Sequence, residues 1–356
     1  MTFKRIFIAS GGTGGHLLPA QILAEELIHR GCDVSFCGKG LDRFLTPDTY
    51  QTFEIHSAPL FQKNPIKMLK SIGSLWIGFC ESLVHIYRKQ PEVVVGFGSY
   101  HSFPVLLAAY LLRKPIVLLE SNCVLGRVNR FFAKKSRALA IQFPLSSTYK
   151  NAVFVPQLPW TSHMVRKKCY HNLDPHVFTF MIFGGSQGAS FLNQLFLKTI
   201  PLMKERFFTF QVVHLTGNAQ VSKEAKEIYD ALGIMHYTRE FEKQIADLYT
   251  QADLVICRAG ANTVGELIQA EKPAFLIPYP FATDQHQTIN AEFFQTVVKG
   301  GCFCEQKYLT PELFLLSLQE LIQKVSLEKF SENIRCYKQK EMLKPKKKLS
   351  EIILDL

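Results

Sequence analysis

Near its start the chain reads Ser10-Gly11-Gly12-Thr13-Gly14-Gly15-His16, after an apolar run at residues 6–9 and before an amphipathic pattern at residues 17–27. This order predicts a buried strand, a glycine-rich turn and a helix. The four glycines expose backbone amides, and the positive end of the helix dipole faces the turn. Such a turn is suited to a bulky anionic ligand. The spacing is not G-x-G-x-x-G, so a nicotinamide cofactor is not the first expectation.

His16 closes this turn and is a candidate general base. The positive field at a helix N-terminus disfavours the imidazolium form, and a neutral imidazole can accept a proton. The alternative is that the glycines form only a turn and that His16 caps the helix or packs against it.

Composition bounds the class of protein. A chain of 356 residues with 47% hydrophobic and 20% charged residues is expected to fold into two globular domains. The net charge of +11 is uneven, because residues 1–160 contain 18 basic and 9 acidic residues. This basic half favours an anionic ligand or surface. No DNA- or RNA-binding motif is present, so no nucleic-acid partner is expected.

The nine cysteines are scattered without a C-x-x-C pair, which is typical of a reduced, cytoplasmic protein. The sequence contains neither D-x-D nor H-E-x-x-H, so no metal site and no cofactor are expected. The first residues run directly into the predicted strand, so no signal peptide is expected. No apolar run reaches the ~20 residues that cross a bilayer, so any membrane contact is expected to be peripheral.

Strand-like and helical runs alternate through both halves, which predicts an α/β protein with two Rossmann-like, doubly wound domains facing a cleft. The second half has its own glycine loop, Gly184-Gly185-Ser186-Gln187-Gly188. We expect domains at 1–160 and 161–330, and a helical tail at 331–356 that packs back on the first domain. In such sheets ligands bind at the carboxyl ends of the strands.

A second strand, turn and helix is predicted at residues 257–266. Amides of residues 261–263 are suited to a diphosphate, and Glu266, one turn further, is suited to ribose hydroxyls. The alternative for Glu266 is a helix-capping acid. Asp284–Asn290 is rich in groups that hydrogen-bond sugar hydroxyls. Residues 96–100 and 120–122 also follow predicted strands, and they are expected at the carboxyl ends of the strands of the first domain, on the cleft side.

The helix predicted at Pro65–Lys89 has an apolar stripe that begins with Leu69, Ile72, Trp76 and Phe79. One interpretation is a helix that faces the core and has a solvated basic end. The other is a patch that binds an anionic membrane. The basic residues at its start are Lys63, Lys67 and Lys70.

Together these motifs resemble the MurG family of bacterial glycosyltransferases, which has two Rossmann-like domains in the GT-B arrangement. The matching segments occur in family order over most of the chain, and seven in order are far more specific than any one alone. They are Gly11–His16, Gly96–Tyr100, Glu120–Asn122, Gly184–Ala189, Glu240–Phe241, Cys257–Glu266 and Asp284–Ala291.

The resemblance implies an inverting transfer of N-acetylglucosamine from UDP-N-acetylglucosamine to the 4-hydroxyl of undecaprenyl-pyrophosphoryl-N-acetylmuramyl-pentapeptide, in peptidoglycan synthesis. It also implies a peripheral enzyme at the cytoplasmic face of the bacterial inner membrane. Its expected partners are the two substrates, an anionic membrane surface and other cell-wall synthesis proteins. The resemblance favours the membrane interpretation of the helix at 65–89.

Residue roles follow from the resemblance as well. It implies His16 as the base, with Glu120 as the second candidate. The implied donor-binding residues are Thr13, Gly14, Gly15, Asn122, Arg166, Ser186, Gln187, Phe241, Ala261, Asn262, Thr263, Val264, Gly265, Glu266, His286 and Gln287. The implied acceptor-binding residues are Thr13, Gly14, Gly15, Tyr100, Glu120 and Asn122. The first domain would bind acceptor and membrane, and the second would bind the UDP-sugar.

The chain departs from the family pattern at two places. The family usually has Gly-Asn-Pro-aliphatic-Arg at the start of the second domain, whereas this chain has Gln157-Leu158-Pro159-Trp160-Thr161. Arg166 is the nearest candidate for the missing arginine, which would lie near the donor phosphates. Ser99 stands where the family usually has glycine, and it is expected to tighten the turn before Tyr100.

Two other classes of function stay open on the sequence. One is a different GT-B enzyme, either a transferase with another lipid acceptor or a UDP-sugar epimerase. The other is a membrane-associated module that binds a UDP-sugar without turnover. Release of UDP that requires the muramyl lipid would distinguish the expected transferase from both.

Overall fold

The computed structural model describes residues 4–12, 14–42, 45, 49–59, 64–157, 173–185, 188–207, 209–242, 244–324, 327–344 and 346–356. Contacts between residues divide the chain into two compact units. Unit 1 comprises Met1–Pro159 and Pro345–Leu356, and unit 2 comprises Trp160–Lys344.

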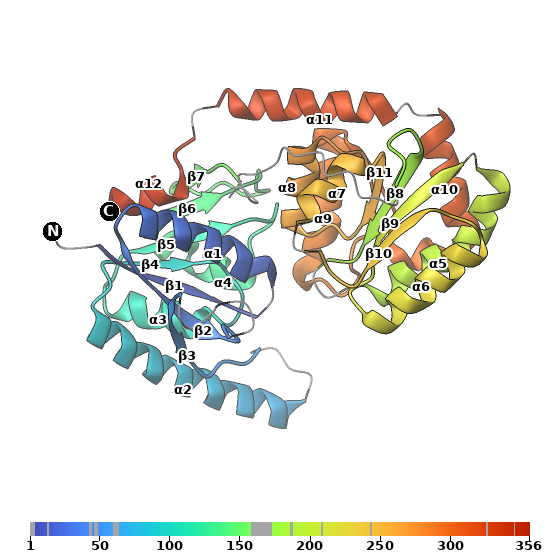
Figure 1. Ribbon diagram of the computed structural model, residues 1–356. Coiled ribbons are helices and arrows are strands. Elements are labelled where there is room, and N and C mark those ends of the chain that lie inside the picture. Colours follow the sequence, from blue (N-terminus) through green and yellow to red (C-terminus); the bar gives the residue numbers. More distant parts are fainter. Residues whose placement is uncertain are drawn as a thin grey trace. The chain divides into compact units, whose positions relative to one another are not determined.

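Unit 1 is built on a parallel sheet with helices on both faces (Figure 1). Among its described residues the strand order is β3-β2-β1-β4-β5-β6-β7. The strands are β1 (Arg5–Gly11), β2 (Asp33–Lys39), β3 (Gln51–Glu54), β4 (Val93–Gly96), β5 (Ile116–Glu120), β6 (Ala138–Ile141) and β7 (Ala152–Phe154). The helices are α1 (Gly14–His29), α2 (Pro65–Lys89), α3 (Phe103–Leu111), α4 (Arg127–Phe132) and α12 (Leu349–Leu354).

The pleat of β1 explains why unit 1 has three layers. Ile6 and Ile8 point into a core shared with α1 and α12, whereas Phe7 and Ala9 point into a core shared with α2, α3 and α4. Successive strand residues face opposite sides of a sheet, and both sides of β1 are buried. A strand covered on both faces needs the continuous apolar sequence found here.

Unit 2 repeats this plan with the strand order β10-β9-β8-β11-β12-β13, parallel throughout. The strands are β8 (Phe178–Phe183), β9 (Phe210–Leu215), β10 (His236–Arg239), β11 (Leu254–Cys257), β12 (Ala274–Leu276) and β13 (Gly301–Phe303). The helices are α5 (Ser190–Arg206), α6 (Ala219–Ala231), α7 (Ile245–Gln251), α8 (Ala261–Ala270), α9 (His286–Phe293), α10 (Pro311–Lys324) and α11 (Leu327–Met342).

In each sheet the strand order reverses at one point: the chain first adds strands on one side of the unit's first strand and then on the other side. In unit 1 this switch lies between β1 and β4, and in unit 2 it lies between β8 and β11. In open parallel sheets, ligands bind outside the carboxyl ends of the strands at this switch. Both glycine loops follow a strand at a switch, so the fold places them where a ligand is expected.

The predicted α/β class with two doubly wound, parallel sheets is confirmed, but four strands were not predicted. They are β3, β6, β10 and β13. Three of them lie at a sheet edge, where half-exposed residues such as those of β3 and β10 do not form an apolar run. The fourth, β6, is a short run of small and apolar residues.

The tail divides differently from the prediction. Residues 331–344 belong to unit 2, where α11 packs against α8. Only the segment after residue 344 returns to unit 1, where α12 packs against α1. Lys4 Nζ donates to Leu354 O at 2.9 Å, and Ser350 Oγ donates to Glu26 Oε1 at 2.8 Å. The predicted tail that packs on the first domain therefore begins too early.

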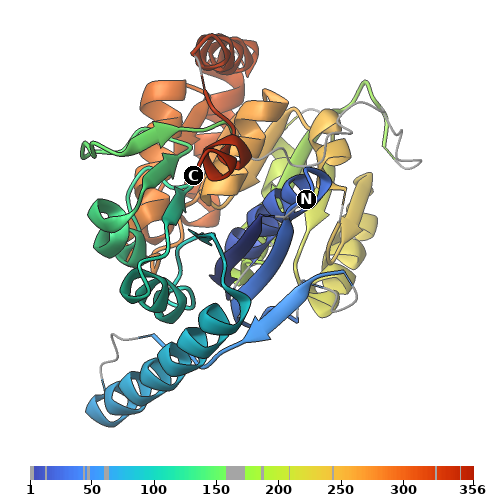
Figure 2. The same cartoon turned by 90° about the vertical axis from the view of Figure 1, so that its left-hand side faces the viewer.

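The apolar stripe of α2 has two environments. Leu69, Ile72 and Trp76 are exposed, at 70%, 46% and 66%, whereas Phe79 is 8% exposed and packs in the core of unit 1. The N-terminal half of α2 projects beyond the rest of the unit (Figure 2). The prediction of Phe79 as part of an exposed patch is therefore wrong. Within the described residues, no helix is both long and apolar enough to cross a bilayer.

Candidate active site

The glycine turn after β1 lies against a buried histidine. Gly12 has a φ of +92°, and a Cβ added there would lie 2.8 Å from Cδ2 and 3.1 Å from Nε2 of His101. A side chain at residue 12 is therefore excluded by backbone conformation and by space. His101 follows β4, so residues from both sides of the switch meet at this turn.

His16 lies in the first turn of α1, close to the loop after β4. A Cβ added at Gly98 would lie 3.7 Å from Cε1 of His16. Ser99 has a φ of +67°, a conformation that glycine adopts more readily. Ser102 Oγ donates to the carbonyls of Gly98, at 2.6 Å, and Ser99, at 2.9 Å, which stabilises this turn before the half-exposed Tyr100.

Glu120 at the end of β5 is buried and fully engaged. Its Oε1 accepts from the backbone and side-chain nitrogens of Asn122, at 3.0 and 2.9 Å. Its Oε2 accepts from Gly126 N at 2.9 Å and Asn129 Nδ2 at 3.0 Å. Two donors on each oxygen fill the lone-pair positions of a carboxylate. Glu120 therefore orients the loop after β5.

In unit 2, Gly188 before α5 packs closely against the residues that follow β9. A Cβ at Gly188, whose φ is +71°, would lie 2.4 Å from Thr216 O, so this position requires glycine. The N-cap of α8 is Gly260, and no side chain caps this helix. The first amides of α8, from Ala261 to Thr263, point out of the helix N-terminus, where an anion is stabilised.

Arg258, between β11 and α8, has a buried positive charge. Its guanidinium donates to the carbonyls of Ile277 and Pro278, both at 3.1 Å, and to Gln306 Oε1 at 2.9 Å. Burial lowers the pKa of Arg258 to about 10, which leaves it charged at neutral pH. These three hydrogen-bond acceptors are uncharged, so the charge adds positive potential near the N-terminus of α8.

Glu266 lies on the second turn of α8 and is half-buried. Tyr249 donates its hydroxyl to Glu266 Oε2 at 2.8 Å. Burial raises the pKa of Glu266 to about 7, against the lowering effect of the Tyr249 hydrogen bond. A further hydrogen-bond donor, such as a diol, would therefore stabilise the ionised form of this carboxylate.

The segment after β12 approaches the same edge. Gln287 Oε1 accepts from Tyr279 N at 2.9 Å, and His286 Nδ1 lies 2.8 Å from Thr283 O. Asp284 and Gln285 have φ values of +51° and +54°, a strained conformation for residues with side chains. These contacts hold residues 286 and 287 at the start of α9.

Two further features complete this edge of unit 2. Asn290 Nδ2 donates to Ala259 O at 3.1 Å and so ties α9 to the turn before α8. Phe241, 55% exposed, follows β10. The structure thus brings the predicted residues 241, 261–266, 286 and 287 to the carboxyl edge of one sheet. In unit 1 it brings Gly14, Gly15, His16, Tyr100, Glu120 and Asn122 to the corresponding edge.

Five predicted residues lie outside the described part of the chain: Thr13, Lys63, Arg166, Ser186 and Gln187. Two residues at the site were not singled out from the sequence, His101 and Arg258. Among the described residues, no group of three or more histidine, cysteine, aspartate or glutamate side chains is placed to hold a metal ion.

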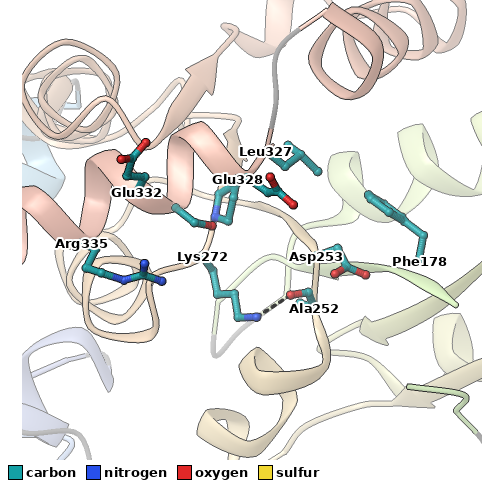
Figure 3. A pocket seen from close by; sticks show the side chains of 10 residues that line it. Phe178, Ala252, Asp253, Lys272, Leu327, Glu328, Glu332 and Arg335 are labelled. Carbon is teal, nitrogen blue, oxygen red and sulfur yellow. Dashed lines mark hydrogen bonds between the residues drawn. The ribbon is translucent and has the colours of Figure 1, made fainter. Parts of the chain in front are cut away.

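A pocket of about 420 Å³ in unit 2 lies elsewhere (Figure 3). It is lined by residues at the amino ends of β8, β11 and β12 and by α11, and Lys272 Nζ donates to Ala252 O at 2.8 Å within it. This is the opposite edge of the sheet from the glycine loop, so the pocket is not part of the candidate active site.

Models of known families match both units. Residues 6–141 match the glycosyltransferase family 28 N-terminal domain, and residues 179–351 match the glycosyltransferase family 28 C-terminal domain. A relative from Protochlamydia amoebophila is 36% identical over 99% of this chain and 96% of its own length. It is named UDP-N-acetylglucosamine–N-acetylmuramyl-(pentapeptide) pyrophosphoryl-undecaprenol N-acetylglucosamine transferase.

The chain belongs to this family of N-acetylglucosamine transferases. A relative of the same name from Chlamydia pneumoniae is 32% identical over 96% of both chains. The predicted family and the predicted class of enzyme, a glycosyltransferase, are thereby confirmed. The crystal structure of Acinetobacter baumannii MurG has the transferase fold found here, with a TM-score of 0.75 and 24% identity over 99% of this chain and 98% of that one.

Proposed function

We propose that this protein transfers N-acetylglucosamine from UDP-N-acetylglucosamine to the 4-hydroxyl of undecaprenyl-pyrophosphoryl-N-acetylmuramyl-pentapeptide, with inversion at the sugar. The observation that carries the proposal is the match, over 99% of the chain, to the relative named for this reaction. The arrangement of chemistry-bearing loops at the carboxyl edges of both sheets supports it.

Unit 2 is proposed to bind the donor. The N-terminus of α8 receives the diphosphate, and the buried charge of Arg258 adds to the stabilisation of the departing UDP. Glu266 accepts hydrogen bonds from the ribose hydroxyls, and Phe241 lies beside the uracil. His286 and Gln287 contact the N-acetylglucosamine. The α8 amides and Arg258 offer one way to balance the diphosphate charge without the arginine missing after Pro159.

Unit 1 is proposed to bind the acceptor at the turn after β1, with Tyr100 and Asn122 beside it. His16 removes the proton from the 4-hydroxyl as that oxygen attacks the anomeric carbon and the bond to UDP breaks. The engagement of both Glu120 oxygens favours His16 over Glu120 as the base. Glu120 positions Asn122 and the loop that follows it.

The product identifies the reaction. The purified protein is incubated with UDP-N-acetylglucosamine and a short-chain soluble analogue of the muramyl lipid, and the product is characterised by mass spectrometry and by the proton coupling at the new anomeric centre. We expect a β-1,4-linked disaccharide on the lipid. An α linkage or a free isomerised sugar would contradict the proposal, and the latter would indicate an epimerase.

The donor site is expected to bind more weakly in acid. The raised pKa of about 7 means that the Glu266 carboxyl of the unliganded protein is mostly protonated at pH 6. Because ribose hydroxyls donate to the ionised carboxylate, donor binding is coupled to the loss of this proton. The Kd of UDP-N-acetylglucosamine is expected to fall about tenfold from pH 6 to pH 8, measured by titration calorimetry. The Glu266→Gln variant should lack this pH dependence. A wild-type Kd that is constant over this range would contradict the role of Glu266.

The same pKa shift makes the unliganded protein less stable as the pH rises, whereas it makes donor binding tighter. The folded state holds the Glu266 proton more tightly than the unfolded state, whose reference pKa is 4.5. This contribution to stability is complete below that value and is lost as pH rises through about 7. Because a ligand stabilises the folded state more when its Kd is lower, UDP should raise the melting temperature more at pH 8 than at pH 6.

We also propose that the exposed part of α2 attaches the protein to the cytoplasmic face of the inner membrane. Leu69, Ile72 and Trp76 form its apolar surface, and Lys67 and Lys70 are exposed beside them. Apolar side chains with neighbouring lysines bind the interface of anionic lipids.

Trp76→Glu is expected to reduce binding to vesicles that contain anionic lipid by about tenfold or more, as measured by co-sedimentation, because it replaces a large apolar side chain with a charge. Turnover with the soluble acceptor should be unchanged. Tyr308→Glu, which changes a 60% exposed aromatic residue of unit 2, is the matched control. Equal vesicle binding by both variants would refute the proposed attachment surface.

A further inference from the structure

His101 is a buried histidine that the proposed mechanism does not use. It is 8% exposed, and its Nδ1 lies 2.6 Å from Ser57 Oγ. One ring face lies against Tyr100, with the ring centres 4.0 Å apart. The edge formed by Cδ2 and Nε2 lies against Gly12 in the turn after β1. Two segments that are distant in sequence, at Gly12 and Ser57, and the neighbouring Tyr100 thus hold this ring in one orientation.

The protonation state of the ring follows from its surroundings. Burial, followed by the charges of Lys39 and His16, lowers the pKa of His101 to about 4, so the ring is neutral at physiological pH. A neutral imidazole carries one proton, on either Nδ1 or Nε2.

Ser57 decides between these two tautomers. Its side chain is 2% exposed, and among the described residues the His101 ring is its hydrogen-bond partner. If Nδ1 donated to Oγ, the hydroxyl proton of Ser57 would be buried without an acceptor, which costs about 1–3 kcal/mol. The favoured arrangement has Ser57 donating to Nδ1, and it leaves the ring proton on Nε2, beside Gly12.

An N–H donor is therefore held beside the turn, in a region of positive potential. Lys39 Nζ donates to Ser57 O at 3.0 Å, so an ammonium group lies behind the Ser57–His101 pair. The N-terminus of α1 contributes the positive end of its dipole to the same turn. Within the described residues no group accepts a hydrogen bond from Nε2. An oxygen anion at the turn would accept this bond.

We propose that His101 is a specificity residue for the acceptor, and that its Nε2–H donates a hydrogen bond to the diphosphate of the isoprenyl-linked substrate. This inference rests on the proposed function, which places the acceptor at the turn after β1, and the positive potential at that turn favours the diphosphate as the part that lies there. Ser57 has a positioning role, because it selects the tautomer and fixes the ring plane. No bond is made or broken by either residue.

Three variants separate hydrogen bonding from packing. His101→Phe fills the space of the ring without an N–H donor. His101→Gln places an amide N–H near the position of Nε2 and so restores the donor. Ser57→Ala leaves the ring in place but removes the group that selects its tautomer. The KM values for the soluble muramyl acceptor and for UDP-N-acetylglucosamine are measured for each, together with the Kd for farnesyl diphosphate.

We expect His101→Phe to raise the acceptor KM and the farnesyl diphosphate Kd by about tenfold, as for the loss of one hydrogen bond to a charged group. The donor KM should change by less than about twofold, because the donor lies on unit 2. His101→Gln should stay within about threefold of the wild type, and Ser57→Ala should lie between the two. Equal values for the Phe and Gln variants, or a change mainly in the donor KM, would overturn the inference.

Two controls keep the result interpretable. If the melting curve shows that His101→Phe does not fold, Ser57→Ala and His101→Gln test the inference instead. A Ser57→Ala protein with the wild-type acceptor KM and farnesyl diphosphate Kd overturns it. If the wild type fails to glycosylate the muramyl acceptor but His101→Phe still weakens farnesyl diphosphate binding, the proposed function fails and the diphosphate contact stands.

Discussion

His16→Ala is expected to lower kcat by about 10²-fold or more, with little change in the affinity for UDP-N-acetylglucosamine. His16 lies in the first turn of α1, at the switch of the unit 1 sheet, and near Gly98 in the loop after β4. A base placed there is proposed to act on the acceptor hydroxyl, whereas the donor is proposed to bind to residues of unit 2. The loss should therefore be in the chemical step.

The measurement is steady-state turnover with the soluble muramyl acceptor, accompanied by a calorimetric titration of UDP. His29→Ala is the matched control, because His29 lies in the last turn of the same helix. It should retain wild-type kcat. Equal kcat for His16→Ala and the wild type would remove His16 from the mechanism, and a large loss of UDP affinity would assign it to the donor site.

Glu266→Ala is expected to raise the Kd of UDP-N-acetylglucosamine by about 10²-fold at pH 8, where the wild-type carboxylate is ionised. The side chain is proposed to accept two hydrogen bonds from the ribose, and bonds to a charged acceptor contribute more than neutral ones. Glu266→Gln should lose about tenfold, because it keeps the shape and an acceptor for Tyr249 but lacks the charge.

Glu271→Gln is the control for this pair of variants. Glu271 follows the C-terminal end of α8 and pairs with Arg335 and Lys338, both at 3.0 Å, on the surface of unit 2. Its replacement should leave the Kd unchanged and have a small effect on stability. If Glu266→Ala binds the donor as well as Glu271→Gln does, the ribose lies elsewhere.

The central strands could be predicted closely from the sequence because of their burial. The ranges 93–96, 178–183, 210–215 and 254–257 are mostly apolar, and the structure has strands over these residues. Edge strands such as β3 and β10 bury one face only in part, so no apolar run marks them. The helical period placed Trp76 and Phe79 on one stripe of α2. It does not say where the packing of that stripe against unit 1 ends.

The candidate site was predictable where a local motif carries the chemistry, as in the glycine turn and the segment around Glu266. It was not predictable where a contact joins distant segments. Ser57 and His101 are 44 residues apart, and no sequence motif links the two positions. Arg258 is part of a recognised segment, but its contacts with the carbonyls after β12 depend on the pairing of β11 with β12.

Release of UDP from UDP-N-acetylglucosamine, with and without the soluble muramyl-pentapeptide lipid analogue, tests the central claim most directly. We expect release to depend on the analogue and to match the amount of disaccharide formed. Equal release without the analogue would contradict the claim. So would an absence of release in its presence by a protein that still binds UDP.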